Sequence, residues 1–379
     1  MSILFEHSEI NGLKLSNRFI RSATWEGKAG VDGSVTPGLI RMMVDLAAGG
    51  VGLIITSHAY VRPAGQAGPW QIGIHEDKLV PGLRRMTHAV HEAGGKIIIQ
   101  LAHAGTFAPQ KLIGRVPFAV SNHEDLAGAP RVELTRRDIQ TVIVAFAEAA
   151  LRARAAGFDG VELHASHGYL LSQFLSPVFN RRRDEYGGDI RNRARIHLET
   201  YRAIRKQVGA DYPVLIKLNC RDFVEGGLGL EDSLVVGTML ADAGVDAIEL
   251  SGGVLTGGRL SPSRTNIDMP DKEAYFREEA RIFKEKIDIP LLLVGGIRSF
   301  EVAECLVADQ VADYISMSRP FIREPGLINR WKSGDRGRAR CTSDNLCFGP
   351  GMKGEGIYCV TEERTKKGSL RNATGSTFS

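Results

Sequence analysis

The stretch that decides the fold is GVELHASHGYLLSQFLSPVFNRRRDEYGG, which covers residues 160–188. It opens on the end of a short apolar run, residues 158–163, and His164, His167 and Tyr169 follow directly. A buried strand that ends in polar side chains is how α/β barrels build their active sites. Two imidazoles can hold a developing negative charge, and a neighbouring phenol can supply a proton. We therefore expect a catalytic site at the end of this strand.

The same pattern of a short apolar run followed by an amphipathic segment recurs along the chain. Several of the amphipathic segments end in Gly, as helix C-termini prefer. A doubly wound open sheet would have a G-x-G-x-x-G sequence after an early strand, and none is present. Eight strands alternating with helices predict a (β/α)8 TIM barrel of the α/β class. The predicted strands are residues 18–21, 51–56, 96–101, 160–163, 214–218, 247–250, 291–294 and 314–317.

The two ends of the chain depart from this alternation. Residues 5–15, with an Asn11-Gly12 turn, predict a β-hairpin that plugs the bottom of the barrel. After Trp331 the pattern fades into a polar end. We therefore divide the chain into a barrel, residues 1–331, and a C-terminal extension, residues 332–379, which wraps the outside and is partly disordered.

Composition excludes several classes of function. The chain has 379 residues, of which 43% are hydrophobic and 24% charged, as in ordinary soluble proteins. No apolar run approaches the ~20 residues of a membrane span, and no signal peptide is evident. Five cysteines argue for a reducing compartment, so we expect a cytoplasmic protein. A net charge of +4 without a dense basic patch argues against nucleic-acid binding. We expect a small-molecule substrate, and a homo-oligomer stays open.

Polar or small residues follow every predicted strand, and in a barrel these positions share one face. Small residues near Gly296, Ser318 and Arg319 suit a phosphate, because backbone N–H groups can approach an anion there and Arg319 adds a fork of donors. Lys217 could stabilise the anionic reduced form of an electron-accepting ring. Gln100 offers a donor and an acceptor to a ring amide.

With these residues laid out, the chain closely resembles the old yellow enzyme family of FMN-dependent ene-reductases, from about residue 5 to about residue 331. It resembles most a branch close to the 2,4-dienoyl-CoA reductases, without their extra domains. The resemblance rests on NRFIRSATWEG, GLIITSHAYV, IIIQLAHAG, LIKLN, VGGIRS, ISMSRPFIREP and the stretch quoted above.

The resemblance implies an NAD(P)H-dependent FMN oxidoreductase that reduces electron-poor C=C bonds, such as those of α,β-unsaturated carbonyls. NADH or NADPH would reduce the flavin and then leave the pocket to the substrate. His164 and His167 would bind the carbonyl or nitro oxygen, and Tyr169 would protonate the neighbouring carbon. The residues implied to bind FMN are Ser22, Ala23, Thr24, Trp25, His58, Gln100, Lys217, Gly296, Ser318 and Arg319.

Some positions depart from the family pattern. Trp25 stands where many relatives have Cys or Thr, and His58 stands where the residue is usually small. Relatives with an iron–sulfur cluster place four cysteines near the C-terminus, whereas this chain has Cys341, Cys347 and Cys359, with Asp344 near the missing one. We interpret this segment as a relic and expect no metal.

Two other functions stay open. An FMN-dependent amine or aromatising dehydrogenase would use the same scaffold in the opposite redox direction. A phosphate-binding isomerase or aldolase would use Lys217 as a base or a Schiff-base amine. We also interpret Cys220 and Cys305 as core thiols, and the run of arginines at 181–183 as a loop that pairs with local carboxylates.

Overall fold

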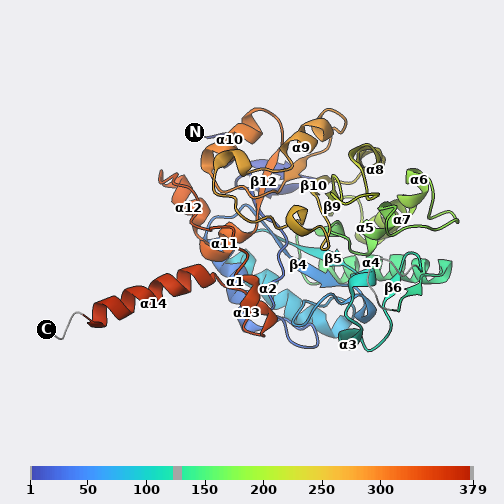
Figure 1. Ribbon diagram of the computed structural model, residues 1–379, viewed down its shortest axis with the longest axis horizontal. Helices are drawn as coiled ribbons and strands as arrows, with labels where there is room; N and C mark the ends of the chain where they lie inside the picture. Colours follow the sequence, from blue (N-terminus) through green and yellow to red (C-terminus); the bar gives the residue numbers. More distant parts are fainter. Residues whose placement is uncertain (1, 123–129, 376–379) are drawn as a thin grey trace.

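The computed structural model describes residues 2–122 and 130–375, and their centre is a closed barrel of eight parallel strands (Figure 1). Around the barrel the strands follow the order β10-β11-β12-β3-β4-β5-β8-β9. The predicted (β/α)8 TIM barrel is confirmed. The barrel strands are β3 (Phe19–Arg21), β4 (Leu53–Tyr60), β5 (Ile97–Ala102), β8 (Val161–Ala165), β9 (Val214–Asn219), β10 (Ala247–Ser251), β11 (Leu291–Leu293) and β12 (Tyr314–Met317).

Helices on the outside connect these strands, and their sequences explain where they begin and what they bury. In α4 (Arg136–Ala155), Thr135 and Asp138 form a capping box, which satisfies free N–H groups of the first turn. Ile139, Val142 and Phe146 then form part of its buried stripe. The other main helices are α1 (Pro37–Ala48), α2 (Val80–Glu92), α7 (Arg195–Val208), α8 (Leu230–Asp242), α9 (Arg277–Lys284), α10 (Phe300–Ala308), α11 (Arg319–Arg323) and α12 (Leu327–Lys332).

Shorter elements lie in the loops. They are α3 (Gln110–Ile113), α5 (Leu170–Leu175), α6 (Ile190–Arg193), the strand pair β6 (Phe118–Ala119) and β7 (Val132–Glu133), and the 3-10 helices η1 (Ile3–Phe5), η2 (Pro63–Gly65), η3 (Asp77–Leu79), η4 (Gly105–Phe107), η6 (Gly258–Leu260) and η7 (Pro270–Lys272). Among the described residues, no helix combines the length and the apolar character that crossing a bilayer requires.

The N-terminal hairpin closes the bottom of the barrel, as predicted. Strands β1 (Ser8–Ile10) and β2 (Leu13–Leu15) pair antiparallel around Asn11 and Gly12, whose φ angles are 44° and 77°. Positive φ at both central residues is the geometry of the tight hairpin turn that Asn-Gly favours. Apolar side chains of the hairpin pack on inward-facing residues of the barrel strands, namely Ile20, Leu53, Ile55, Ile98, Leu215, Ala247 and Leu292.

The C-terminal extension returns to the barrel instead of only lying outside it. Arg338 pairs with the buried Glu273 at 2.8 Å, and the Ile357 N–H donates to the carbonyl of Glu26 at 2.8 Å. The extension includes α13 (Phe348–Met352) and α14 (Val360–Gly375), which extends away from the barrel (Figure 1). Neither helix was predicted. Residues 376–379 lie outside the described part of the chain, and the division at residue 331 stays a prediction.

One of the two predicted core thiols is exposed. Cys220 is buried, but Cys305 is exposed on α10. The buried residues of α10 are Phe300, Ala303, Leu306 and Val307, which form one stripe of the helix. Cys305 lies on the opposite face of the helix, because it is two positions from both Ala303 and Val307, and residues two apart point in nearly opposite directions. An apolar neighbourhood in the sequence therefore did not imply burial.

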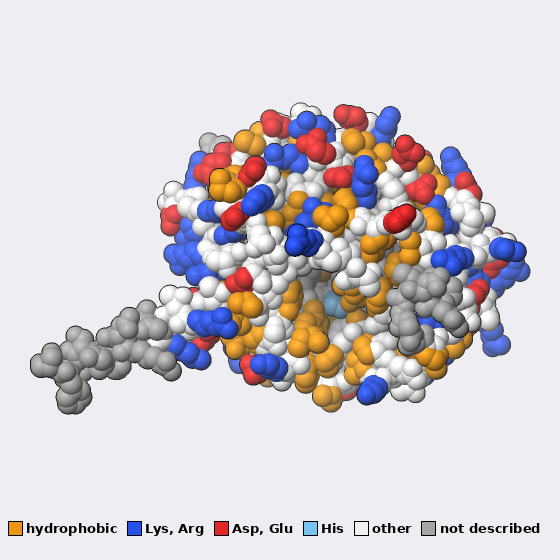
Figure 2. All heavy atoms as spheres, in the orientation of Figure 1, with side chains coloured by type: hydrophobic (Ala, Val, Ile, Leu, Met, Phe, Trp, Pro, Cys, Tyr) orange, Lys and Arg blue, Asp and Glu red, His pale blue; other side chains and the backbone are white. Residues whose placement is uncertain are grey.

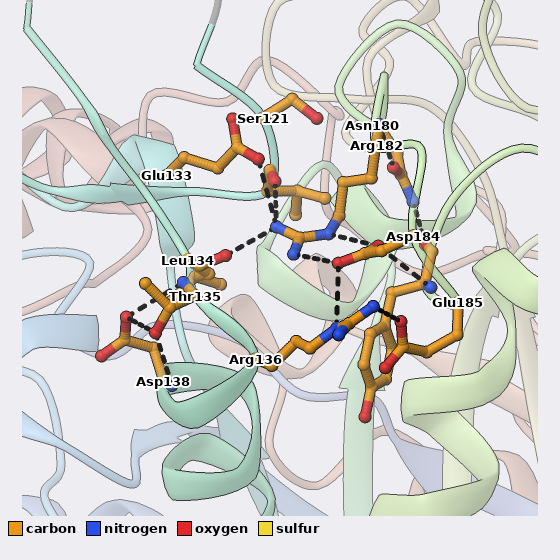
Figure 3. A network of polar contacts seen from close by, with 12 residues as sticks. Ser121, Glu133, Leu134, Thr135, Arg136, Asp138, Asn180, Arg182, Asp184 and Glu185 are labelled. Atoms are coloured by element: carbon orange, nitrogen blue, oxygen red, sulfur yellow. Dashed lines mark hydrogen bonds and ion pairs between the residues drawn. The ribbon is translucent and has the colours of Figure 1, made fainter.

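The loop after β8 is held by a buried arginine (Figure 3). The Arg182 side chain is only 5% exposed and forms a bidentate pair with Asp184, at 2.9 and 2.5 Å. Its Nη1 also donates to the carbonyls of Val120, at 2.9 Å, and Leu134, at 2.6 Å. Both carbonyls belong to residues that flank the β6–β7 pair, so Arg182 ties this pair to the loop. The expected pairing of the arginine run with local carboxylates is confirmed here.

Replacing Arg182 with Ala should lower the free energy of unfolding by about 3–5 kcal/mol, because it removes the buried guanidinium that binds both the Asp184 carboxylate and two carbonyls. The exposed neighbour Arg183 is the matched control, and Arg183→Ala should stay within about 0.5 kcal/mol of the parent. Urea unfolding of the three proteins measures both values. Equal losses from the two variants would contradict the structural role of Arg182.

Candidate active site

A cavity of about 1050 Å³ opens at the carboxyl end of the barrel strands. Figure 2 shows it as a hollow with a histidine at its floor and hydrophobic side chains around its rim. Every residue that we predicted to be catalytic or to bind the cofactor lines it, and these come from seven of the eight strand ends. They are Ser22, Ala23, Thr24, Trp25, His58, Gln100, His164, His167, Tyr169, Lys217, Gly296, Ser318 and Arg319.

The two histidines and the tyrosine form a compact cluster after β8. The centroid of the His164 ring lies 5.2 Å from that of the His167 ring and 5.0 Å from that of the Tyr169 ring. His167 Nε2 lies 2.8 Å from Ser251 Oγ, and His164 Nδ1 lies 3.2 Å from Ser166 Oγ. These contacts occupy one ring nitrogen of each histidine and leave the other for a ligand.

The backbone at His167 is unusual for a non-glycine residue. Its φ is 63°, in the left-handed region, and its N–H donates to Asn219 Oδ1 at 3.1 Å. Gly168 follows with φ 84°. Conformations of this kind persist where the surroundings hold them, and they concentrate at functional sites. The turn directs the His167 ring and the Tyr169 ring back over the cavity.

Burial makes these side chains electrically neutral at physiological pH. Burial, followed by the charges of His167, His58 and Lys217, lowers the pKa of His164 well below its ordinary value. Burial, followed by the charge of Lys217, does the same to the pKa of His167. Burial also raises the pKa of the Tyr169 phenol. The cluster therefore offers two neutral imidazoles and a phenol that keeps its proton.

His58 contacts this cluster from the neighbouring side. Its Nε2 lies 3.3 Å from the Tyr169 hydroxyl, and burial lowers the pKa of His58 to about 4. The structure thus places His58 beside Tyr169, in the same cavity that the predicted cofactor residues line. A neutral imidazole at this distance can fix the direction of the phenol O–H.

Lys217 and Gln100 lie at the floor of the cavity. The Lys217 ammonium donates to Ser22 Oγ at 2.8 Å and to Glu249 Oε2 at 2.7 Å. The Gln100 amide donates to Glu162 Oε2 at 2.6 Å. Both side chains are almost fully buried. A fixed positive charge and an oriented amide therefore face any ring that enters the cavity.

The ends of β11 and β12 combine close-approach glycines with hydrogen-bond donors. Gly296 has φ 75°, and a Cβ there would lie 2.7 Å from the Tyr275 ring. Thr24 Oγ1 and Ser318 Oγ are 2.6 Å apart. Arg319 Nη1 donates to the Arg264 carbonyl at 2.8 Å and to Asn345 Oδ1 at 2.7 Å. These two bonds hold the guanidinium in place and use only one of its nitrogens.

Several lining residues were missed by the sequence analysis. Ser343 and Phe348 reach the cavity from the C-terminal extension, and Tyr275 reaches it from the segment before α9. No alternation of strand and helix marks these positions. Ser251 directly follows the predicted strand 247–250 but was not predicted as part of the site, although that position could have suggested it.

The three C-terminal cysteines lie around a separate small hollow. Asp344, which stands near the missing fourth cysteine, accepts hydrogen bonds from Thr342 at 2.7 Å and from Thr361 at 2.6 Å. Within residues 2–122 and 130–375, no group of three or more His, Cys, Asp or Glu residues has the arrangement of a metal site.

Comparison with known proteins identifies the family. The sequence profile of the NADH:flavin oxidoreductase / NADH oxidase family matches residues 3–337, and this chain belongs to that family. Its cofactor is FMN, and its members use NADH or NADPH as the reductant.

Two curated relatives show the range of lengths within the family. An NADH oxidase of Thermoanaerobacter brockii is 38% identical over 353 residues, which cover 91% of this chain and 53% of the relative. An NADPH dehydrogenase of Listeria innocua is 35% identical over 333 residues, which cover 86% of this chain and 93% of the relative. This chain therefore spans about half the length of the first relative and nearly all of the second.

Solved structures show the same barrel. Morphinone reductase superposes with a TM-score of 0.74 at 27% identity, covering 88% of this chain and 90% of that one. Histamine dehydrogenase from Rhizobium sp. 4-9 superposes with a TM-score of 0.84 at 28% identity, covering 94% of this chain and 52% of that one.

The cavity fits FMN on its own chemistry. One end offers Arg319, hydroxyls and the close-approach glycines, which suit a phosphate. The floor offers a buried ammonium and an amide, which suit a polar aromatic ring.

The stability of the protein should fall as the pH drops from about 6.5 toward 4. Burial lowers the pKa of His197 to about 4, whereas an unfolded histidine has a pKa of about 6.5. The unfolded chain therefore binds more protons in this window, and acidification favours unfolding by about 1.4 kcal/mol per pH unit for each such histidine. His197→Gln should reduce the slope of unfolding free energy against pH by that amount.

The exposed His88 provides the control for this slope. His88→Gln should leave the slope nearly unchanged, because the exposed imidazole titrates in a similar environment in the folded and unfolded chain. An unchanged slope in His197→Gln would show that His197 does not stay neutral in the folded protein.

Proposed function

We propose that the protein is an NAD(P)H-dependent FMN oxidoreductase that reduces electron-poor C=C bonds, such as those of α,β-unsaturated carbonyl compounds. The observation that carries the proposal is the cluster of His164, His167 and Tyr169 facing one cavity with Lys217. It combines hydrogen-bond donors for an oxygen with a protonated phenol in a largely water-excluded site. The family membership supports the redox chemistry, and the similarity to morphinone reductase supports the substrate class.

The proposed cofactor contacts divide between the two ends of the cavity. Gly296, Ser318 and Arg319 would hold the phosphate, and Ser22, Ala23, Thr24, Trp25, His58, Gln100 and Lys217 would contact the ring. When bound, FMN supplies a hydride acceptor for NAD(P)H and a hydride donor for the alkene. The Lys217 ammonium favours negative charge on the ring that it faces, because it is buried and its position is fixed by two hydrogen bonds.

His164 and His167 would hold the oxygen of the substrate. Neutral imidazole N–H groups polarise a carbonyl without the cost of burying two positive charges near Lys217. Their partner residues, Ser166 and Ser251, fix the orientation of the rings before the substrate arrives. Hydrogen bonds to the oxygen would make the alkene a better hydride acceptor. They would also stabilise the negative charge that develops on the oxygen as hydride adds.

Tyr169 would deliver the proton to the carbon next to the carbonyl. Its raised pKa keeps the phenol protonated at neutral pH, so the proton is available when the carbon becomes basic. His58, 3.3 Å from the hydroxyl, fixes the side from which the phenol approaches. Delivery of hydride and proton from opposite faces of the alkene would give trans addition of hydrogen.

A second candidate is an FMN-dependent amine or aromatising dehydrogenase. The chain superposes on histamine dehydrogenase with a higher TM-score, 0.84, than on morphinone reductase, 0.74. The superposition on histamine dehydrogenase also covers more of this chain, 94%, than the superposition on morphinone reductase, 88%. Such an enzyme would oxidise its substrate and pass the electrons to another acceptor.

The visible spectrum of the purified protein separates these functions. We expect flavin absorption near ~450 nm that bleaches on anaerobic addition of NADH or NADPH and returns on addition of 2-cyclohexenone. Bleaching without recovery by the enone would favour the dehydrogenase. A colourless protein that takes up no added FMN would contradict both and favour the isomerase or aldolase.

Tyr169→Phe should slow the reoxidation of the reduced enzyme by the enone by roughly 10²–10⁴-fold, the usual contribution of a general acid. Reduction by the nicotinamide should change little, because it needs no proton from this residue. Tyr212→Phe is the matched control, since the Tyr212 hydroxyl is buried and has no partner among the described residues. Unchanged enone reduction in Tyr169→Phe would show that another group supplies the proton.

A further inference from the structure

Two carboxyl groups are buried together beneath the cavity floor. Glu162 lies on β8 and Glu249 on β10, and both are completely buried. Lys217, on the strand between them, pairs directly with Glu249 in the ladder and binds its Oε2 at 2.7 Å. Among the described residues no cation forms an ion pair with Glu162, and its Oε2 accepts from the Gln100 amide at 2.6 Å. Two buried acids therefore share one ammonium.

The surroundings of the two acids differ, because the hydroxyls of Ser22 and Ser316 lie near enough to Glu249 to stabilise its charge. Glu162 Oε1 and Glu249 Oε1 are both buried without a hydrogen-bond partner among the described residues. The two carboxyl groups are close enough for a hydrogen bond between them to act on Glu162. A single proton between the two side chains would give Glu162 Oε1 a partner, whereas two ionised carboxylates would leave that oxygen unpaired and place like charges side by side.

The charge balance of the floor points in the same direction. The groups that face Glu162 are Gln100 on β5, Lys217 on β9 and Glu249 on β10. If both acids were ionised, this fully buried group would carry one uncompensated negative charge, which costs several kcal/mol. Burial, followed by the charge of Glu249, raises the pKa of Glu162 well above its ordinary value. For Glu249 burial is the largest effect and raises the pKa, but Lys217 and the hydroxyls of Ser316 and Ser22 together outweigh it, so the pKa is lowered.

We propose that Glu162 is a neutral carboxylic acid that donates its proton to Glu249, and that it is a positioning residue for Gln100 and Lys217. The neutral acid uses its carbonyl oxygen to accept from Gln100, which turns the amide oxygen of Gln100 toward the cavity. Its O–H completes the shell of Glu249, which in turn holds the Lys217 ammonium. Glu162 thus acts on a bound ring only through these two residues.

Infrared spectroscopy of the purified protein tests the proton at pH 7. The difference spectrum between the parent and Glu162→Gln should show one carboxylic-acid C=O band in the parent, and this band should shift in heavy water. Gln is the isostere of the neutral acid, so the variant keeps the acceptor for Gln100 and a donor for Glu249. Asp222, whose pKa burial also raises, is present in both proteins and cancels.

Glu92→Gln, at an exposed carboxylate, is the matched control and should remove no such band. If Glu162→Gln also removes no acid band, Glu162 is ionised and the proposal is wrong. This measurement does not depend on any cofactor, so it stands even if the proposed function fails.

The positioning role rests on the proposed function and is tested by FMN affinity, measured from the quenching of flavin fluorescence. Glu162→Ala removes the acceptor of the Gln100 amide and should raise the dissociation constant about tenfold. Glu162→Gln should change it less than about threefold, because a neutral acceptor remains. In a Gln100→Ala background the Glu162→Ala substitution should add less than about twofold, since its effect acts through Gln100.

An equal effect of Glu162→Ala with and without Gln100 would overturn the positioning role. A protein that binds no FMN in any form would contradict the proposed function but not the shared proton. If Glu162→Ala does not fold, the infrared band of Glu162→Gln still decides the protonation state. The FMN affinity of Glu162→Gln then tests the positioning role, and a loss as large as that of Gln100→Ala would contradict the role of the neutral acceptor.

Discussion

The parallel pairing of β9 with β8 and β10 is the constraint on which the cavity depends. The register sets His164 opposite Lys217 and Lys217 opposite Glu249, so three polar side chains lie at one level of the inner wall. Because side chains alternate along a strand, Glu162 points inward two residues earlier. A shift of one residue in either ladder would turn Lys217 or its partners outward. The hydrogen bonds that close the barrel therefore also fix the charge balance beneath the proposed ring site.

The part of the site that follows the barrel rule was predictable from the sequence. Each barrel strand is rich in apolar residues, and polar residues at or just after the end of each strand had to lie near the shared face of a closed parallel barrel. This reasoning placed Gln100, Lys217 and the His164 cluster in one cavity without knowledge of any contact. It also identified the Asn11-Gly12 hairpin, because only a few residue pairs favour positive φ at both turn positions.

The rest depends on contacts that no local pattern records. Ser343 and Phe348 reach the cavity through a segment that has neither strand nor helix periodicity, and its position follows from ion pairs such as Arg338–Glu273. The contact between His58 and Tyr169 joins residues 111 positions apart. The prediction that Cys305 is buried was wrong for a different reason. Most residues around it are apolar, so the sequence does not show which side of the helix faces the barrel.

The closure of the cavity by the C-terminal extension has a consequence for the order of events during synthesis. The first barrel strand, β3, pairs with β12, so it waits for residue 317 before the barrel can close. Trp25, after β3, then waits for Gly351 and residues around it to pack against its indole ring. The segment after the first barrel strand is thus completed by residues more than three hundred positions later in the chain. Until translation has passed residue 351, the cavity lacks the wall that the C-terminal extension supplies.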